Sequence, residues 1–228
     1  MHEIASGKWY SGVDVGEALR YAGVRSAESC PDEMAADAAR AVNQVGEAAL
    51  CKAISRECSL TVSDGICVID GMEIRSDSLA EHLAGCDRAL LFAATLGSGV
   101  DLLISRYSTV KMSYAVLLQG AAAALIELYC DSECALLEEK YAEEGCCLLP
   151  RFSPGYGDFP LECQNFLTNH LSAYKYTGIA VSAGGQMTPM KSVSAVIGIS
   201  RERKSARGNC ASGKCAECSN TECLFRRV

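Results

Sequence analysis

The chain has 228 residues, of which 49% are hydrophobic, so it can bury a substantial core. Its start has no basic segment followed by an apolar run and a small-residue cleavage site. The most apolar stretch, residues 115–128, is interrupted by Gln119 and Glu127 and is shorter than the roughly 20 residues that a membrane span requires. These features predict a cytoplasmic protein with no membrane segment.

The formal net charge is −7, and it is unevenly distributed. Residues 201–228 carry seven Lys or Arg against three Glu, so residues 1–200 carry a formal charge of −11. An acidic body argues against general nucleic-acid binding. Fourteen cysteines in a chain of this size and apolar content indicate reduced thiols rather than a disulfide framework.

The first half of the chain predicts two helices followed by a β-meander. Apolar residues recur at helical spacing in both helices, and Asp-Gly pairs at 64–65 and 70–71 predict tight turns between the strands. The expected helices are 14–22 and 31–51, and the expected strands are 59–62, 66–69 and 72–74.

The second half mixes helices and strands around a long apolar helical segment. The expected elements are a helix at 78–85, a buried strand at 89–93, helices over 99–144 broken near 108–109, a strand from 145 through 151, a helix at 161–173, and strands at 177–182 and 192–200. We predict an α+β fold: one domain, 1–200, with an antiparallel twisted sheet flanked by helices. A linker and a cysteine-rich tail at 201–228 follow it.

Two motifs carry a resemblance to a known family. Residues 151–156, Arg-Phe-Ser-Pro-Gly-Tyr, resemble the Arg-x-x-x-Gly-Tyr signature of the activation domain of cobalamin-dependent methionine synthase. Residues 187–195, Met-Thr-Pro-Met-Lys-Ser-Val-Ser-Ala, are similar to that family's Pro-x-x-Ser-Val-Ser-Gly stretch and follow in the same order. Residues 94–97, Ala-Thr-Leu-Gly, and the alanine-rich helix that carries Glu127 resemble small stand-alone members of the family. The resemblance covers about residues 90–200.

The first motif is also chemically suited to a small polar ligand. The planar guanidinium of Arg151 can hold a carboxylate through two parallel hydrogen bonds. A Pro-Gly turn at Gly155 allows the backbone to approach a ligand closely, and Tyr156 offers a hydroxyl or an aromatic face to a sulfonium. Without the resemblance, a surface turn whose arginine forms a salt bridge would explain the same residues.

The resemblance implies an S-adenosylmethionine site and a corrinoid partner. Arg151, Ser153, Gly155 and Tyr156 would line a cleft with the strand near Ser192, and Glu127 would lie close to the ligand. The family's role is to supply the methyl group that traps reduced cobalt as methylcobalamin, with an electron from a flavodoxin-type reductase. The expected partner is a corrinoid protein, or a methionine synthase that lacks its own activation domain.

The chain departs from complete methionine synthases. The corrinoid-binding pattern Asp-x-His-x-x-Gly is absent, because Ala80 precedes His82 and Gly85 where an aspartate belongs, and His82 is interpreted as an exposed helix residue. Cobalamin would therefore sit on the partner. The alternative is a non-catalytic S-adenosylmethionine sensor or corrinoid-protein chaperone whose cysteine tail senses metal or redox state. A third possibility makes the tail a small zinc module for nucleic acid.

The tail itself predicts a metal site. Its cysteines are spaced Cys-x4-Cys-x2-Cys-x4-Cys, and so short a segment has few apolar residues with which to fold without a metal. Four thiolates suit tetrahedral zinc or an iron–sulfur cluster, and the spacing is compatible with both. The candidate ligands are Cys210, Cys215, Cys218 and Cys223.

Overall fold

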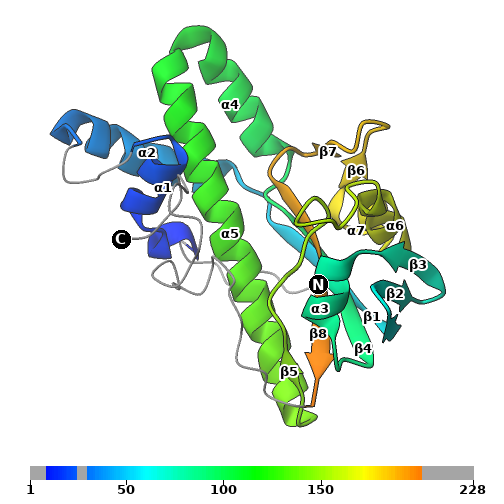
Figure 1. The fold of residues 1–228 in the computed structure, drawn as a ribbon. Coiled ribbons are helices and arrows are strands. Elements are labelled where there is room, and N and C mark those ends of the chain that lie inside the picture. The colour runs from blue at the N-terminus through cyan, green and yellow to red at the C-terminus, as the bar shows by residue number, and fades with distance from the viewer. Residues whose placement is uncertain (1–8, 25–29, 202–228) are drawn as a thin grey trace.

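The computed structural model describes residues 9–24 and 30–201, and their centre is a six-stranded antiparallel sheet (Figure 1). The strand order is β3-β2-β1-β4-β8-β5. The strands of this sheet are β1 (Lys52–Ser63), β2 (Ile66–Ile69), β3 (Met72–Arg75), β4 (Arg88–Thr95), β5 (Cys147–Leu148) and β8 (Ser192–Ser200). A separate two-stranded ribbon pairs β6 (Ala180–Val181) with β7 (Met187–Thr188). The α+β class with a helix-flanked antiparallel sheet is confirmed.

Strands β1, β2 and β3 form the expected meander. Asp64 and Asp70 occupy the left-handed region, with φ of 49° and 46°, and each is followed by a glycine with positive φ. Aspartate tolerates this conformation because its short side chain can bond locally. The first strand begins earlier than expected, at Lys52, because its first eight residues pair with β4 rather than with the meander.

Helices cover both faces of the sheet (Figure 1). One core cluster joins alternate residues of β4 and β8, such as Phe92 and Ile197, to the first group of helices. The other cluster joins the intervening residues, such as Leu91 and Val196, to the second group. The first group is α1 (Val15–Tyr21), α2 (Asp32–Ala48), α4 (Ser98–Val110) and α5 (Met112–Glu143), with the 3-10 turn η1 (Trp9–Gly12); the second is α3 (Asp77–Leu83), α6 (Cys163–His170) and α7 (Ala173–Thr177). Strand β4 is buried along most of its length, because both of its faces pack against helices.

The long helix α5 is the central helix of the first layer. The expected break in the helical segment lies at Lys111, where φ is −150°. By length and composition α5 could cross a membrane, but 61% of its most apolar stretch is buried inside the protein. This arrangement is compatible with a soluble protein.

The segment between α5 and β8 differs from expectation. The strand expected to run through Arg151 is limited to β5 and an isolated bridge between Phe152 and Val196. The helix expected over 161–173 is divided into α6 and α7 by Ser172, which has a φ of 51°. The strand expected over 177–182 is reduced to β6, because Thr177 is the last residue of α7 and Gly178 caps that helix. These short irregular elements leave residues 153–160 as a loop next to α3.

Candidate functional site

Arg151 lies against α5, and its guanidinium contacts two carboxylates there. Nη2 donates to Oε2 of Glu127 at 2.9 Å, and Nη1 donates to Oδ1 of Asp131 at 2.9 Å. Nη1 also lies 3.5 Å from the sulfur of Cys134. The Arg151 side chain is only 14% exposed, whereas those of Glu127 and Asp131 are 45% and 61% exposed. The cluster therefore presents two carboxylates to solvent around a largely buried cation.

Burial acts to lower the pKa of Arg151, but its neighbours raise the pKa above the ordinary value. Those neighbours include the sulfurs of Cys130 and Cys134 and the carboxylate of Asp131. Burial also raises the pKa of both thiols. The arginine is therefore charged at any physiological pH, and the cluster of Arg151 with its two carboxylates has a net charge of −1 when both are ionised.

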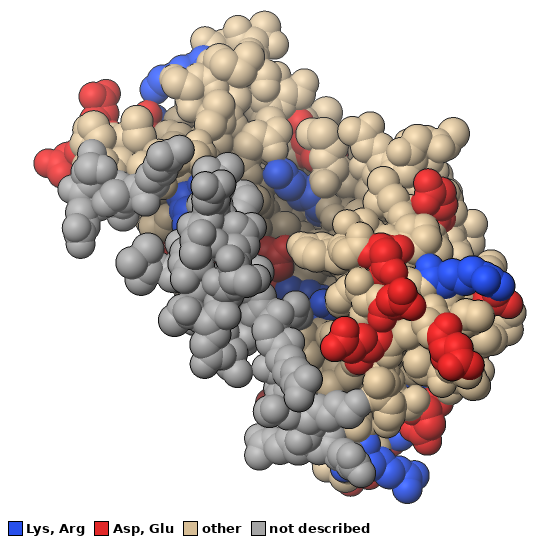
Figure 2. Space-filling model, viewed as in Figure 1, with Lys and Arg blue, Asp and Glu red and all other residues tan. Residues whose placement is uncertain are grey.

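Sequence reasoning brought Arg151 and Glu127 together but missed Asp131 and Cys134. Residues 127, 131 and 134 have i, i+4, i+7 spacing, which places them on one face of a helix. That spacing was the available signal. In the space-filling view, acidic and basic side chains meet in a hollow beside α5 (Figure 2).

The loop after Arg151 is a tight turn that glycine makes possible. Tyr156 N–H donates to the Ser153 carbonyl at 3.2 Å, and Gly155 N–H donates to the Phe159 carbonyl at 2.8 Å. Gly155 has a φ of 92°, which favours glycine. Tyr156 is 67% exposed, and its ring centroid lies 6.4 Å from that of Phe152. Its aromatic face is thus available at the surface of the turn.

Asp158 attaches this turn to the start of α3. Its carboxylate accepts hydrogen bonds from Ser76 Oγ at 2.6 Å, from Asp77 N–H at 2.8 Å and from Ser78 N–H at 3.0 Å. These donors, with the Ser76 hydroxyl first among them, hold the pKa of Asp158 well below its usual range. Gly157, the residue before Asp158, lies close to α3, since a Cβ there would stand 2.8 Å from Cβ of Ser78. Asp158 therefore has a structural role in fixing the turn.

His82 is half-buried, not the exposed helix residue that the sequence suggested. Its Nε2 lies 2.9 Å from the carbonyl oxygen of Pro150, and its ring centroid lies 4.9 Å from that of Phe152. The histidine thus contacts the backbone of the residue before Arg151 and the side chain of the residue after it. It supports the turn from the side opposite α5.

Ser192 does not lie beside Arg151. Phe152 bridges Val196, four residues further along β8, and four residues of strand span about 13 Å. The Ser192 hydroxyl donates to the Pro189 carbonyl at 2.7 Å and lies 2.8 Å from Oγ1 of Thr95. The serine stabilises the junction of β4 and β8, and a ligand that contacts both it and Arg151 would have to be extended along the strand.

Two open depressions lie elsewhere, beside α6. One, of about 590 Å³, is lined by Met72, Phe166 and His170 among others, and the second, of about 380 Å³, lies between α6 and β6. Neither is lined by Arg151 or Tyr156. The four tail cysteines, Cys210, Cys215, Cys218 and Cys223, lie outside the described residues.

Comparisons with known proteins agree with this fold. No protein-family model matches the sequence, and no curated protein matches it. A solved structure described as the MetH reactivation domain bound to AdoHcy is similar, with a TM-score of 0.57 and 14% identity over 77% of this chain and 69% of that chain. At this identity the likeness establishes a shared fold and supports the resemblance at that level.

Proposed function

We propose that this chain binds S-adenosylmethionine and supplies its methyl group for the reductive reactivation of cob(II)alamin on a partner corrinoid protein. The observation that carries the proposal is the Arg151 cluster: an Arg-x-x-x-Gly-Tyr turn lies against two exposed carboxylates of the central helix, in a fold similar to a reactivation domain that was solved with AdoHcy.

The cluster suits the amino-acid end of this ligand. An α-amino acid presents a carboxylate and an ammonium side by side, and Arg151 with Glu127 and Asp131 presents the complementary charges. In our proposal the ligand's carboxylate bonds to the guanidinium, and its ammonium bonds to the helix carboxylates. Tyr156 and the backbone of the turn at Gly155 and Ser153 hold the remainder.

The chain's contribution to the reaction is binding and orientation. The methyl group on the sulfonium is already activated for transfer, and reduced cobalt on the partner is the nucleophile, so no acid or base is needed from this chain. Holding the two reactants in line can supply much of the rate. The electron comes from a separate donor such as a flavodoxin-type reductase. In an assay, free cob(I)alamin can take the place of the partner.

Calorimetry with S-adenosylmethionine and S-adenosylhomocysteine tests the binding step. Arg151→Ala should weaken binding by about 1.5 to 3 kcal/mol, the range for a hydrogen bond to a charged group, and Arg75→Ala, an exposed arginine on β3, is the matched control. Absence of binding to the wild-type protein would overturn the proposal.

Methyl transfer separates this function from a sensor or chaperone. The wild-type protein should accelerate transfer from S-adenosylmethionine to cob(I)alamin presented by a corrinoid protein, but should not itself retain cobalamin, because it lacks the Asp-x-His-x-x-Gly pattern. Tight binding of S-adenosylmethionine without transfer would favour the sensor or chaperone.

A further inference from the structure

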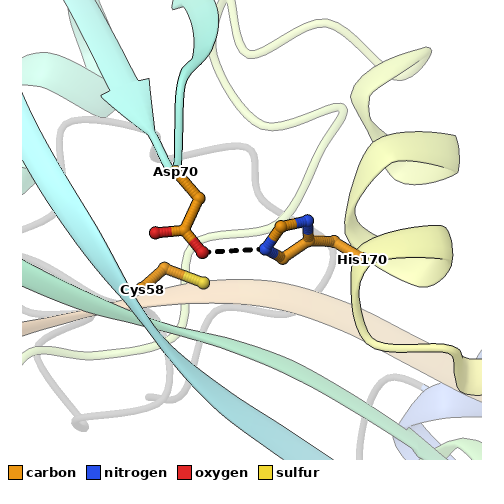
Figure 3. A group of neighbouring side chains, drawn as sticks. All are labelled: Cys58, Asp70 and His170. Carbon is orange, nitrogen blue, oxygen red and sulfur yellow. Dashed lines mark hydrogen bonds and ion pairs between the residues drawn. The ribbon is translucent and has the colours of Figure 1, made fainter.

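Three side chains from distant parts of the sequence converge on the face of the sheet that carries α6 (Figure 3). Cys58 comes from β1, Asp70 from the turn between β2 and β3, and His170 is the last residue of α6. The thiol sulfur, a carboxylate oxygen and an imidazole nitrogen all lie within 4.8 Å of one another. We propose that these residues form a site for a divalent metal ion, and that the ion is Zn²⁺.

The donor set is the first reason for this assignment. Thiolate, imidazole and carboxylate are the groups that bind zinc in proteins, at about 2.0 to 2.3 Å. Tetrahedral geometry at those bond lengths separates neighbouring ligand atoms by about 3.5 Å. Asp70 Oδ2 and His170 Nε2 are 2.8 Å apart and share a hydrogen bond, so a small outward movement would admit a metal in place of the shared proton.

Hydrogen bonds from neighbouring residues hold Asp70 and the end of α6 in position. The other oxygen of Asp70, Oδ1, accepts hydrogen bonds from the Ser59 amide at 2.8 Å and from the Ser59 hydroxyl at 3.0 Å. Arg56 donates to the carbonyl of His170 at 3.1 Å and so fixes the end of α6. Hydrogen bonds of this kind hold ligand carboxylates and histidines in place in metal proteins.

Access is the third reason. Cys58 is buried, whereas the side chains of Asp70 and His170 are about one quarter exposed. His170 also lines the 590 Å³ depression, together with Met72 and Asn169. An ion can therefore reach the three ligands from that side, and a water molecule can complete a tetrahedral shell there.

The geometry is less suited to a Cys-His-Asp nucleophilic site. In such a site the imidazole bonds to the thiol through one nitrogen and to the carboxylate through the other. Here Nε2 of His170 faces both the Asp70 oxygen and the Cys58 sulfur. Burial raises the pKa of the Cys58 thiol to about 12, so that without a metal the sulfur is protonated. Binding of Zn²⁺ would release that proton to solvent.

The test uses the full chain with all four tail cysteines changed to serine, so that the tail does not contribute metal binding. We expect this parent protein to bind one equivalent of Zn²⁺ and to show a higher Tm with the metal. Bound Co²⁺ should give a thiolate-to-metal charge-transfer band in the near ultraviolet. Cys58→Ser should remove that band, and both Cys58→Ser and His170→Gln should weaken Zn²⁺ binding by about tenfold or more.

Cys163→Ser is the matched control, because Cys163 is a partly buried cysteine at the start of α6 outside the cluster. It should leave binding and the band unchanged. If Cys58→Ser fails to fold, His170→Gln decides the question, since His170 is partly exposed. A parent protein that binds no Zn²⁺, or a His170→Gln variant that binds it with unchanged affinity, would overturn the site. Neither result depends on S-adenosylmethionine binding.

Discussion

The charge balance around Arg151 has a consequence for ligand choice. One buried guanidinium and two exposed carboxylates leave the cluster with an excess of one negative charge. S-adenosylmethionine carries a positive sulfonium that S-adenosylhomocysteine lacks. If the proposed function holds, the cluster should favour the methyl donor over the demethylated product, which would assist product release.

The double change Glu127→Gln with Asp131→Asn should reduce that preference for S-adenosylmethionine. It removes both negative charges but keeps similar side-chain shapes, so binding of S-adenosylmethionine should weaken by about 1 to 3 kcal/mol and that of S-adenosylhomocysteine should weaken less. Calorimetry with each ligand measures the ratio. Glu139→Gln, an exposed glutamate further along α5, is the control. An equal loss for both ligands would contradict the electrostatic argument.

At the scale of the elements, local patterns predicted most of the fold. The Asp-Gly pairs predicted both turns of the meander, and apolar periodicity predicted the two N-terminal helices. Long-range pairing was less visible, because no pattern within residues 52–58 indicates that they pair with β4. The turn at Ser172, which divides α6 from α7, was also missed, because it contains no glycine or proline.

The same limit applies to the candidate sites. The Arg-x-x-x-Gly-Tyr motif is contiguous and was visible, but its partner Asp131 lies on a helix 20 residues earlier, and its contact depends on how that helix packs. Cys58, Asp70 and His170 are separated by up to 112 residues and share no motif. The fold brings them together by placing the last residue of α6 next to Asp70 and Cys58.

Helices α1 and α5 pack so closely that a methyl group would not fit between them. A Cβ on Gly120 would collide with the carbonyl oxygen of Ala18 and stand 2.9 Å from Cβ of Ala22. Gly120→Ala should therefore destabilise the protein by about 1 to 3 kcal/mol, despite alanine's higher helix propensity. Thermal or urea unfolding measures the change. Gly12→Ala, where a Cβ meets nothing within 4 Å, should be near neutral; equal stability of the two variants would contradict the packing.

The hydrogen bonds that Asp158 accepts at the start of α3 should make the stability of the fold depend on pH in the acid range. Asp158 has a pKa below its usual range in the folded protein, because Ser76 and the amides of Asp77 and Ser78 donate to its carboxylate. Its stabilisation is therefore complete above the unfolded carboxyl pKa of about 4 and is lost as pH falls through the lower folded value. Asp158→Asn should lower the Tm at pH 7, and the difference from wild type should shrink as pH is lowered below about 4. A difference that is constant down to pH of about 2 would contradict this assignment.

At the scale of the whole molecule, the two candidate sites lie on opposite faces of the sheet. The Arg151 cluster contacts α5 in the first layer, and the Cys58 cluster contacts α6 in the second. Acidic side chains also gather over α3, the β2–β3 hairpin and the loop before α6 (Figure 2). The basic residues 201–228 follow directly on β8, so the charge asymmetry of the sequence separates an acidic body from a basic tail.

In the tail, we predict a metal bound by Cys210, Cys215, Cys218 and Cys223. Anaerobic purification with metal analysis and a visible spectrum distinguishes the two candidates: about four irons with a broad visible absorption would indicate a cluster, and one colourless zinc beyond the Cys58 site would indicate a structural centre. Cys210→Ser with Cys215→Ser should abolish that metal, because two of four thiolates are lost, while Cys30→Ser should not. A cluster would link the tail to the electron that reactivation consumes, so this pair of changes should then also slow cobalamin reactivation. If no metal is retained and reactivation is unchanged in the double variant, the tail has no ligand role.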